Sequence, residues 1–374
     1  MIYVIGIALV YLIKLVSTQT LESRDSVLAR KFCIFFSIGV FFLIAALRGD
    51  QVGEDTDSYI RKFFAIQEHG IGDILTSLYT EKVEFGYALL NKLVGSLGGG
   101  GQAMLAVNSF IVCLAMARFL YCHTDSDITG LIVLICCGLY PHSLNGTRQI
   151  MAAMLLLNAW GELTEGKLKK SLLFFAAAFS FHITSIVFLV AYLLYFCKDR
   201  KKLFLLLLGA TMVTLVFSEQ ILRFIGMFTS KFDSYLRNTE VRVRVGGIWL
   251  VWIVEIGMAL FFLADYAAGK RLRERLPVEL PHSAMNVQAC ISALVLIYIE
   301  ITLIGTQMNF FDRFGWYFMG FTALLILEFE KVVKTAVPKL HKLFLLGVHV
   351  GFVALFFLSV RAEQYQYYFF WNQF

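Results

Sequence analysis

Residues 32–47, FCIFFSIGVFFLIAAL, carry no charged side chain, and the residues that follow, RGDQVGEDTDSY (48–59), bring one arginine and four acids. Backbone N–H and C=O groups find no water partner in lipid, so an uncharged apolar run of this kind predicts a helix inside a bilayer. The sudden return of charge marks the point where the chain leaves the hydrocarbon. A membrane helix followed by a polar surface loop is therefore the pattern that these residues predict.

The same pattern repeats along the whole chain. Of its 374 residues, 59% are hydrophobic and 16% are charged, a balance that excludes a water-soluble domain of this size. The first residues, MIYVIGIALVYLIKLV, lack the basic leader and the small-residue cleavage site of a signal peptide, so we expect a first span there. We expect one integral membrane domain over residues 1–374, with no nucleic-acid partner, since the sequence has no nucleic-acid motif, P-loop or HExxH.

The apolar runs predict an all-α polytopic membrane protein with about twelve transmembrane helices. If the clusters of Lys and Arg between them are all cytoplasmic, the spans alternate consistently with both termini outside, as the positive-inside rule requires. The two long outer loops are then 48–102 and 218–247. The predicted spans are 2–16, 32–47, 103–121, 127–145, 148–163, 171–181, 183–197, 202–217, 248–268, 285–304, 314–330 and 343–360.

Two segments do not fit simple crossings. FGYALLNKLVGSLG (85–98) has only about half the ~20 apolar residues that a span needs, so we expect a re-entrant or interfacial helix on the outer face. The long apolar stretch 171–196 has basic clusters at both ends, and we break it at residues 180–182 into a hairpin with His182 at its outward tip. A single tilted span is the alternative, and it would reverse the topology of everything after it.

This topology collects polar residues from distant parts of the chain on the outer face. Some of them have ordinary structural explanations: Arg48 can extend to the interface, and Asp55 can cap the amphipathic run 57–69. His182 can be a core histidine bonded to a carbonyl, although a polar group at a break in a membrane helix is also typical of a functional site. The collected residues are Arg48, Asp55, Glu84, Arg148, His182 and Arg313.

Arg148 is the hardest of them to explain by structure alone. It opens a span on the side that should be poor in basic residues. A planar guanidinium donates two bonds to a phosphate or carboxylate, and the start of a helix adds a favourable dipole. We therefore interpret Arg148, with its neighbour Gln149, as an anion-binding site. Arg313 in NFFDRFGWYF is similar, although Asp312 beside it offers a plain ion pair.

The outer loop 218–247 is basic and includes Arg242 and Arg244. Two interpretations stay open. The loop is either a solvated amphipathic helix on the membrane surface or a mobile lid that holds anionic head groups.

Six short segments, taken together in their order and spacing, resemble the EpsG branch of the Wzy-type bacterial polysaccharide polymerases, which make O-antigen, capsule and exopolysaccharide. One departure is Glu54, where a small residue is expected before the aspartate. The six segments are LRGDQVGEDTDSY (47–59), VEFGYALLNKLV (83–94), GTRQIMAAMLLL (146–157), SFHITSIVFLV (180–190), FFDRFGWYF (310–318) and YQYYFFW (365–371).

The resemblance implies a glycosyltransferase of the all-helical, GT-C-like membrane type in the bacterial inner membrane, with its active site on the periplasmic side. Such a protein transfers a growing glycan from undecaprenyl pyrophosphate to the non-reducing end of the next lipid-linked repeat unit. The resemblance implies no cofactor and no metal. A chain-length regulator is a further partner that it allows.

This chemistry needs a base for the acceptor hydroxyl and fixed cations for the departing pyrophosphate. Arg148, Arg313 and Arg48 are the expected cations, and His182 would bind or protonate the pyrophosphate. Glu84 or Asp55 would be the base. Glu84 is preferred, because it lies where the outer loop meets the short helix and is expected to be partly desolvated.

A flippase for the same lipid-linked oligosaccharide is the main alternative. It would also need arginines for pyrophosphate, and Glu255 or Glu300, which lie inside predicted spans, could carry its protons. A flippase should have polar residues along a path through both faces, whereas the candidates here gather on one face. A ligase, or an O-acyltransferase that uses His182, is a further alternative.

Overall fold

The computed structural model describes residues 1–20, 26–76, 83–126, 128–197, 248–268, 282–305 and 309–373, with a few single residues between 209 and 220. Helices make up the regular structure of these residues, so the all-α prediction is confirmed. The chain divides into two compact units, Met1–Ile186 with Leu345–Phe374, and Val187–Phe344. Whether they act as one domain stays a prediction, and each is described by itself.

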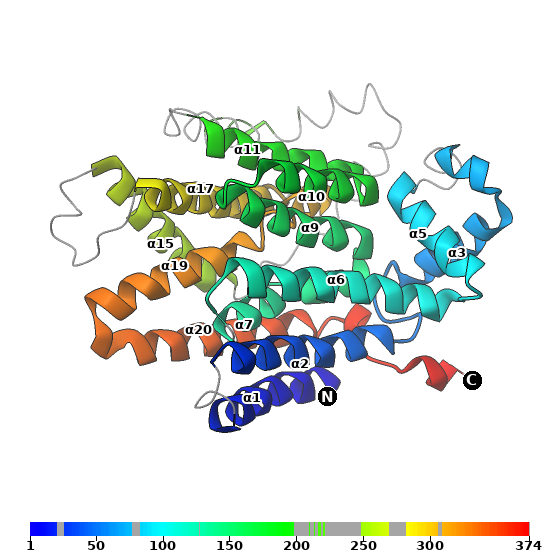
Figure 1. Ribbon diagram of the computed structural model, residues 1–374, viewed down its shortest axis with the longest axis horizontal. Helices are drawn as coiled ribbons and strands as arrows, with labels where there is room; N and C mark the ends of the chain where they lie inside the picture. Colours follow the sequence, from blue (N-terminus) through cyan, green and yellow to red (C-terminus); the bar gives the residue numbers. More distant parts are fainter. Residues whose placement is uncertain are drawn as a thin grey trace. The chain divides into compact units, whose positions relative to one another are not determined.

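The first unit is a layer of long helices with shorter ones at one end. Helices α1, α2, α6, α9 and α10 lie side by side in that order, and α3 packs on α5 beside them (Figure 1). The elements of this unit are α1 (Ile2–Thr20), α2 (Ser26–Ala46), α3 (Thr56–Glu68), η1 (Ile71–Thr76), α5 (Phe85–Ser96), α6 (Gly101–His123), α7 (Thr129–Cys136), α8 (Leu139–Asn145), α9 (Thr147–Thr164), α10 (Leu168–Phe181), η3 (Glu363–Tyr365) and η4 (Phe370–Gln373).

Helix α6 defines the two ends of this unit. At its start, the Gln102 amide donates to the carbonyl oxygens of Ala46 (2.5 Å) and Arg48 (3.2 Å). At its other end, His123 Nδ1 lies 2.6 Å from Glu165 Oε1, just after α9. A helix of this length spans about 34 Å, close to the ~30 Å of a hydrocarbon core. We call the end of the unit near Gln102 the loop end, and the end near His123 the Glu165 end.

Helix α9 forms the core of the first unit. Almost every residue from Thr147 to Leu163 is buried, since α9 packs between α6 and α10. An ion pair between Arg118 of α6 and Glu162 of α9, and a 2.6 Å bond from Arg118 to Asn158, fix the register of these helices at the Glu165 end.

One predicted span is not a single helix. Residues 127–145 do not form a continuous helix, because α7 ends at Cys136 and α8 begins at Leu139. Gly138, between them, has φ 122°, a conformation that only glycine adopts readily. Every residue of α7 is buried, so its apolar sequence reflects packing inside the protein and not contact with lipid.

The second unit is built around α17. Helices α11, α15, α18 and α19 all pack on it or on one another, and Glu255 and Glu300 are buried in this unit. The elements are α11 (Leu189–Phe196), α15 (Ile248–Ala268), α17 (His282–Gly305), α18 (Asn309–Gly315) and α19 (Phe321–Ala336); η2 (Ile183–Phe188) and α20 (Pro338–Ser359) have residues in both units.

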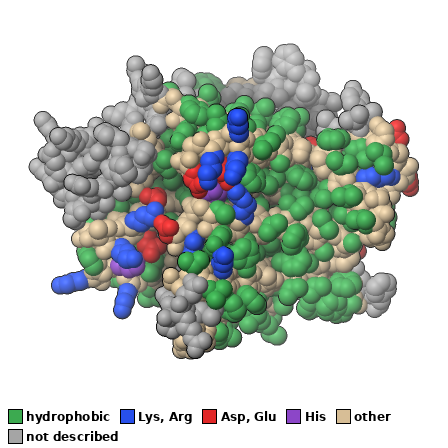
Figure 2. Space-filling view, in the orientation of Figure 1, with side chains coloured by type: hydrophobic (Ala, Val, Ile, Leu, Met, Phe, Trp, Pro, Cys, Tyr) green, Lys and Arg blue, Asp and Glu red, His purple; other side chains and the backbone are tan. Residues whose placement is uncertain are grey.

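Among the described residues, five helices are long and apolar enough to cross a membrane: Ile2–Thr20, Ser26–Ala46, Gly101–His123, Asn286–Gly305 and Pro338–Ser359. Figure 2 shows hydrophobic side chains over a large part of the visible face, with charged side chains gathered in small groups. A surface of this kind suits a lipid environment. The count of twelve crossings stays a prediction, and the predicted span 202–217 and the loop 218–247 lie almost entirely outside the described residues.

Two sequence predictions about helix boundaries are confirmed. The segment 85–98 contains a short helix, α5, of 12 residues, and its re-entrant or interfacial placement on the outer face stays a prediction. The apolar stretch 171–196 breaks where expected, because α10 ends at Phe181 and His182 has an extended backbone with φ −155° and ψ 113°. The hairpin geometry of the chain beyond this break, and the side of the membrane that it faces, stay predictions.

Candidate functional site

Glu84 lies at the N-terminus of α5, with an extended backbone (φ −74°, ψ 152°), and its side chain is only 10% exposed. The approach of α5 to α10 depends on Gly86. A Cβ atom at this position would lie 2.3 Å from the hydroxyl oxygen of Ser180 and 2.8 Å from its carbonyl oxygen. This absence of a side chain allows the start of α5 to pack against the end of α10, which brings Glu84 next to the residues that follow α10.

Arg148 contacts Glu84 from a different helix. It is the second residue of α9, and its Nη1 donates to Glu84 Oε2 in an ion pair that is mostly shielded from solvent. Two aromatic rings flank the guanidinium: its Cζ atom lies 5.6 Å from the ring centre of Tyr59 in α3 and 5.5 Å from that of Tyr87 in α5. Ring faces attract a cation, so Tyr59 and Tyr87 hold the guanidinium beside the carboxylate.

His182 contacts the other oxygen of the same carboxylate. Its Nδ1 lies 3.3 Å from Glu84 Oε1, and the backbone N–H of Ile183 donates to that oxygen at 3.4 Å. Thr184 Oγ1 lies 3.2 Å from the same ring nitrogen. The structure therefore joins three of the predicted site residues in direct contact; we call Glu84, Arg148 and His182 the Glu84 cluster.

The geometry of the Glu84 cluster determines what it can do. A carboxylate only accepts hydrogen bonds, so the ring nitrogen of His182 that faces it carries the proton when the two are bonded, and the neutral imidazole then has Nε2 as its proton acceptor. Arg148 uses Nη1 for Glu84, and a guanidinium has five N–H donors in all. The cluster thus combines a proton acceptor with a cation suited to phosphate.

Asp55 stands at the loop end, at the N-cap of α3, where its side chain makes no capping hydrogen bond. Its backbone N–H donates to Asn145 Oδ1 at 2.9 Å, and Tyr59 lies one helical turn further along α3. The preceding turn packs tightly on α8, since Gly53 has φ 94° and a Cβ atom there would lie 2.0 Å from the Leu144 carbonyl oxygen. Asp55 is therefore held against α8, at the start of the helix that carries Tyr59, and its function stays a prediction.

Arg48 does not extend to the membrane surface, so the snorkelling interpretation is wrong. Its side chain is fully buried, and Nη1 donates to the Ala45 carbonyl (2.6 Å) and to Ser109 Oγ (3.1 Å). Its Nε and Nη2 have no hydrogen-bond partner among the described residues. Burial lowers the pKa of Arg48, which shows how poorly this site solvates its charge.

The remaining predicted residues lie in different settings. Gln149 is buried in α9 directly after Arg148. Arg313 belongs to the second unit, where it is exposed and its Cζ lies 5.8 Å from the ring centre of Trp316. That Arg313 lies near Arg148 in one site stays a prediction. Arg242 and Arg244 lie outside the described residues.

Sequence reasoning missed Tyr59 and Tyr87. Both lie inside segments that carry the family resemblance, 47–59 and 83–94, and both are buried although tyrosines at a membrane surface usually sit in the interface. Their rings contact each other edge to face, with centres 6.0 Å apart. No spacing rule links two tyrosines on different helices to one arginine, so only the recurrence of tyrosine beside the acidic residues could have indicated them.

Searches of curated proteins and of solved structures gave no match to this chain. The sequence profile of the EpsG family, in contrast, matches residues 31–372, which is nearly the whole chain and includes every residue of the Glu84 cluster. This family is of the polysaccharide-polymerase type, with glycosyltransferase-like activity. A match of this extent shows that the chain belongs to the EpsG family.

Proposed function

We propose that this protein is a polysaccharide polymerase that transfers a growing glycan from undecaprenyl pyrophosphate to a lipid-linked repeat unit at the extracytoplasmic face of the bacterial inner membrane. One observation carries the proposal: Arg148 and His182 contact the two oxygens of the Glu84 carboxylate from two different helix ends. Family membership supports the type of reaction. The substrate, the lipid donor and the side of the membrane are part of what we propose.

Arg148 would bind the pyrophosphate of the donor. As the bond between the anomeric carbon and the diphosphate oxygen breaks, the electron pair leaves with the diphosphate, and a fixed cation stabilises this growing charge. The ion pair with Glu84 and the two tyrosine rings hold the guanidinium in place before substrate arrives. Such preorganisation is worth more in a partly buried site than in water.

Glu84 and His182 would handle the proton. The acceptor hydroxyl attacks the anomeric carbon and must lose its proton, which passes to Nε2 of His182 while Nδ1–H faces Glu84. The resulting imidazolium is stabilised by the carboxylate and can later donate its proton to the released diphosphate. Glu84 orients the histidine in this proposal, which differs from the sequence-based preference for Glu84 as the base, because both of its oxygens already face Arg148 and His182. Direct proton transfer to Glu84 is the competing assignment, and Asp55 would orient the loop and the sugar.

Arg313 and the loop residues Arg242 and Arg244 are proposed to add positive charge around the lipid diphosphate. A cation clamp of several arginines neutralises a diphosphate without a divalent metal ion. Polymerisation should therefore proceed in the presence of a chelator.

The experiment uses purified full-length protein and defined lipid-linked repeat units, with products separated on a gel. Wild-type protein should give a ladder of lengthening products, and Arg148→Ala should leave only unextended repeats. Arg61→Ala is the matched control, because Arg61 lies on the exposed face of α3 in an ion pair with Asp57. A normal ladder from Arg148→Ala would contradict the proposal, and movement of lipid-linked repeats across vesicles without extension would support a flippase instead.

A further inference from the structure

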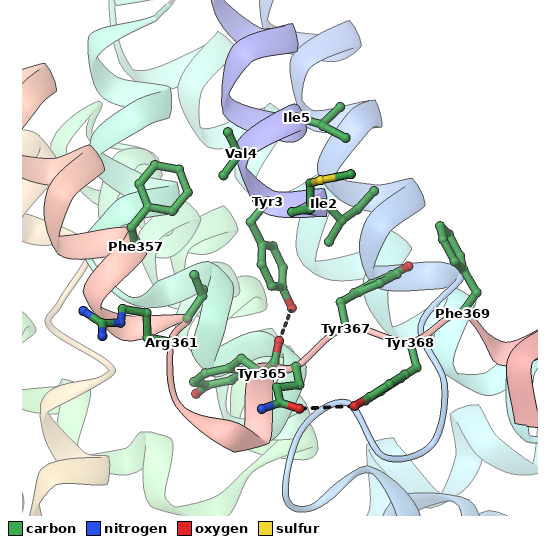
Figure 3. Close-up of a pocket in the computed structure, with 13 residues that line it drawn as sticks. Ile2, Tyr3, Val4, Ile5, Phe357, Arg361, Tyr365, Tyr367, Tyr368 and Phe369 are labelled. Carbon is green, nitrogen blue, oxygen red and sulfur yellow. Dashed lines mark hydrogen bonds between the residues drawn. The ribbon is translucent and has the colours of Figure 1, made fainter.

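A groove of about 750 Å³ lies at the loop end of the first unit, apart from the residues of the Glu84 cluster. Figure 3 shows its walls: the first residues of α1, the end of α20 and the C-terminal segment 365–369. Two of these walls are the ends of candidate membrane spans, Ile2–Thr20 and Pro338–Ser359. The groove therefore lies where these helices are expected to leave the hydrocarbon.

Hydrogen bonds hold the third wall, the C-terminal segment, in place. The Tyr3 hydroxyl donates to the Tyr365 carbonyl at 3.2 Å (Figure 3), and the Tyr367 hydroxyl donates to the Ile44 carbonyl at 2.9 Å. The backbone N–H of Gly49 donates to the Tyr368 carbonyl at 2.8 Å, and Arg48 and Phe369 form a β-bridge. Defined hydrogen bonds therefore hold this wall of the groove against the loop that leads to Asp55.

The lining has two chemically different parts. Aliphatic and aromatic carbon from Ile2, Val4, Ile5 and Phe357 forms one part, and Val4 and Ile5 are also exposed on the outer surface of α1. Tyrosine hydroxyls and the amide of Gln366 form the other. A ligand with an alkyl chain and a polar head fits such a lining, because the chain can continue along the apolar surface of the helix.

The polar part of the groove is positively charged. Arg361 is exposed at the edge of the groove, and Figure 3 shows its guanidinium pointing away from Tyr3 and Tyr367. A phosphate bound by Arg361 would therefore lie at the outer edge of the groove. Arg48 does not line the groove, but its charge acts on Tyr367, which does: burial raises the pKa of Tyr367 to about 12, and the positive charge of Arg48 opposes this rise. Arg48 forms no ion pair among the described residues, so its charge is available to attract an anion through a poorly screening interior.

We propose that this groove binds the phosphate end and the first isoprene units of a polyprenyl-linked substrate. The inference rests on the proposed function, because polymerisation brings two lipid-linked glycans together and the Glu84 cluster supplies a site for one diphosphate. The groove would hold the lipid of the other, which is the acceptor repeat unit. Arg361 would contact its phosphate, and the wall formed by Val4, Ile5 and Phe357 would contact its chain.

The test measures binding of geranylgeranyl phosphate to the purified full chain by native mass spectrometry. Every variant also carries Arg148→Ala, so that binding at the Glu84 cluster is removed. Arg361→Ala should weaken binding about tenfold, since it deletes a charge-assisted contact. Ile5→Trp should weaken binding to a similar degree by filling the groove. Leu358→Trp is the matched control, because Leu358 is exposed on α20 and does not line the groove.

Binding of three further ligands is compared with that of geranylgeranyl phosphate to identify which chemical class the groove binds. Geranylgeraniol, inorganic phosphate and phosphatidylglycerol should each bind at least tenfold more weakly than the prenyl phosphate. Unchanged binding of geranylgeranyl phosphate in both Arg361→Ala and Ile5→Trp would overturn the proposal, as would equal binding of phosphatidylglycerol or of phosphate alone. Arg361 is exposed, so its loss should leave the fold intact. The proposed function is tested by a different measurement: it would be contradicted if the Arg148→Ala variant still made polymer of normal length.

Discussion

Nδ1 of His182 lies 3.3 Å from Oε1 of Glu84, although the two residues are far apart in the chain. Three local features produce this contact. Helix α10 ends at Phe181, helix α5 begins directly after Glu84, and Gly86 lets the two helix ends approach. The carboxylate then has one oxygen for His182 and one for Arg148, so a change at any of the three residues should affect the other two.

The role of His182 can be separated from that of Glu84 by chemical rescue. His182→Ala should lower the rate of polymerisation by about a hundredfold or more, because it removes the proposed proton acceptor. Added imidazole should restore part of this rate, since a small base can enter the space that the side chain vacates. The rate is measured as repeat units added per minute to lipid-linked acceptor.

Glu84→Gln is the matching variant, and it should not respond to imidazole because it keeps the histidine but removes the charge that orients it. If imidazole restores neither variant and Glu84→Gln is the more damaged of the two, Glu84 itself is the base. Full activity of His182→Ala would exclude the histidine from the chemistry.

The close approach of α5 and α10 gives a prediction about Gly86. Gly86→Ala should lower both the unfolding temperature and the activity, because its Cβ would overlap Ser180 and the helix ends would have to separate. Overpacking of this kind costs about 1–3 kcal/mol. Thermal unfolding of the detergent-purified protein measures the first effect, and the polymer ladder measures the second.

Gly39→Ala is the control for that variant. Gly39 lies inside α2, and a Cβ atom there would meet nothing within 4 Å. Alanine should be neutral or stabilising at this position, since it is the better helix former by about 1 kcal/mol. Equal effects of the two substitutions would show that the contact with Ser180 does not matter.

Much of this arrangement could be predicted from sequence because it depends on local signals. The absence of charge in 32–47 predicts α2, and the basic clusters at both ends of 171–196 predict a break at residues 180–182. Apolar composition alone did not reveal the helix break in 127–145 or the burial of α7, since it cannot distinguish contact with lipid from contact with protein. Arg48 was misinterpreted for a related reason: a sequence shows where a charge leaves a helix but not what then covers it.

The clustering of Glu84, Arg148 and His182 was predicted only as a shared face, and the contacts themselves depend on the packing of α5 and α9 around α10. Tyr59 and Tyr87 could not be found in this way, because their role exists only once three helices have met around one guanidinium. Long-range contacts of this kind leave no fixed spacing in the sequence.

Burial of Arg48 predicts an unusual response to substitution. Arg48→Met should unfold at the same temperature as the wild type or higher, because it removes a desolvated charge and two donors without partners among the described residues. The unsatisfied Ala45 carbonyl that remains costs about 1–3 kcal/mol, less than the several kcal/mol of a buried unpaired charge.

Arg48→Ala provides the comparison, and it should unfold at a lower temperature because it leaves a cavity beside Ser109. Thermal unfolding of both variants in the same detergent gives the answer. A strong loss of stability in Arg48→Met as well would show that the charge itself stabilises the loop end.

The two ends of the first unit should be accessible from opposite sides of the membrane. Asp55 lies at the loop end, which we propose to be extracytoplasmic, and the exposed Cys122 lies near the Glu165 end of α6. In intact cells a membrane-impermeant thiol reagent should label Asp55→Cys and should leave Cys122 unlabelled until the membrane is permeabilised. A Cys122→Ser background identifies which thiol reacts. Labelling of Cys122 in intact cells, with protection of residue 55, would reverse the orientation and place the Glu84 cluster on the cytoplasmic side, where a periplasmic polymerase could not use it.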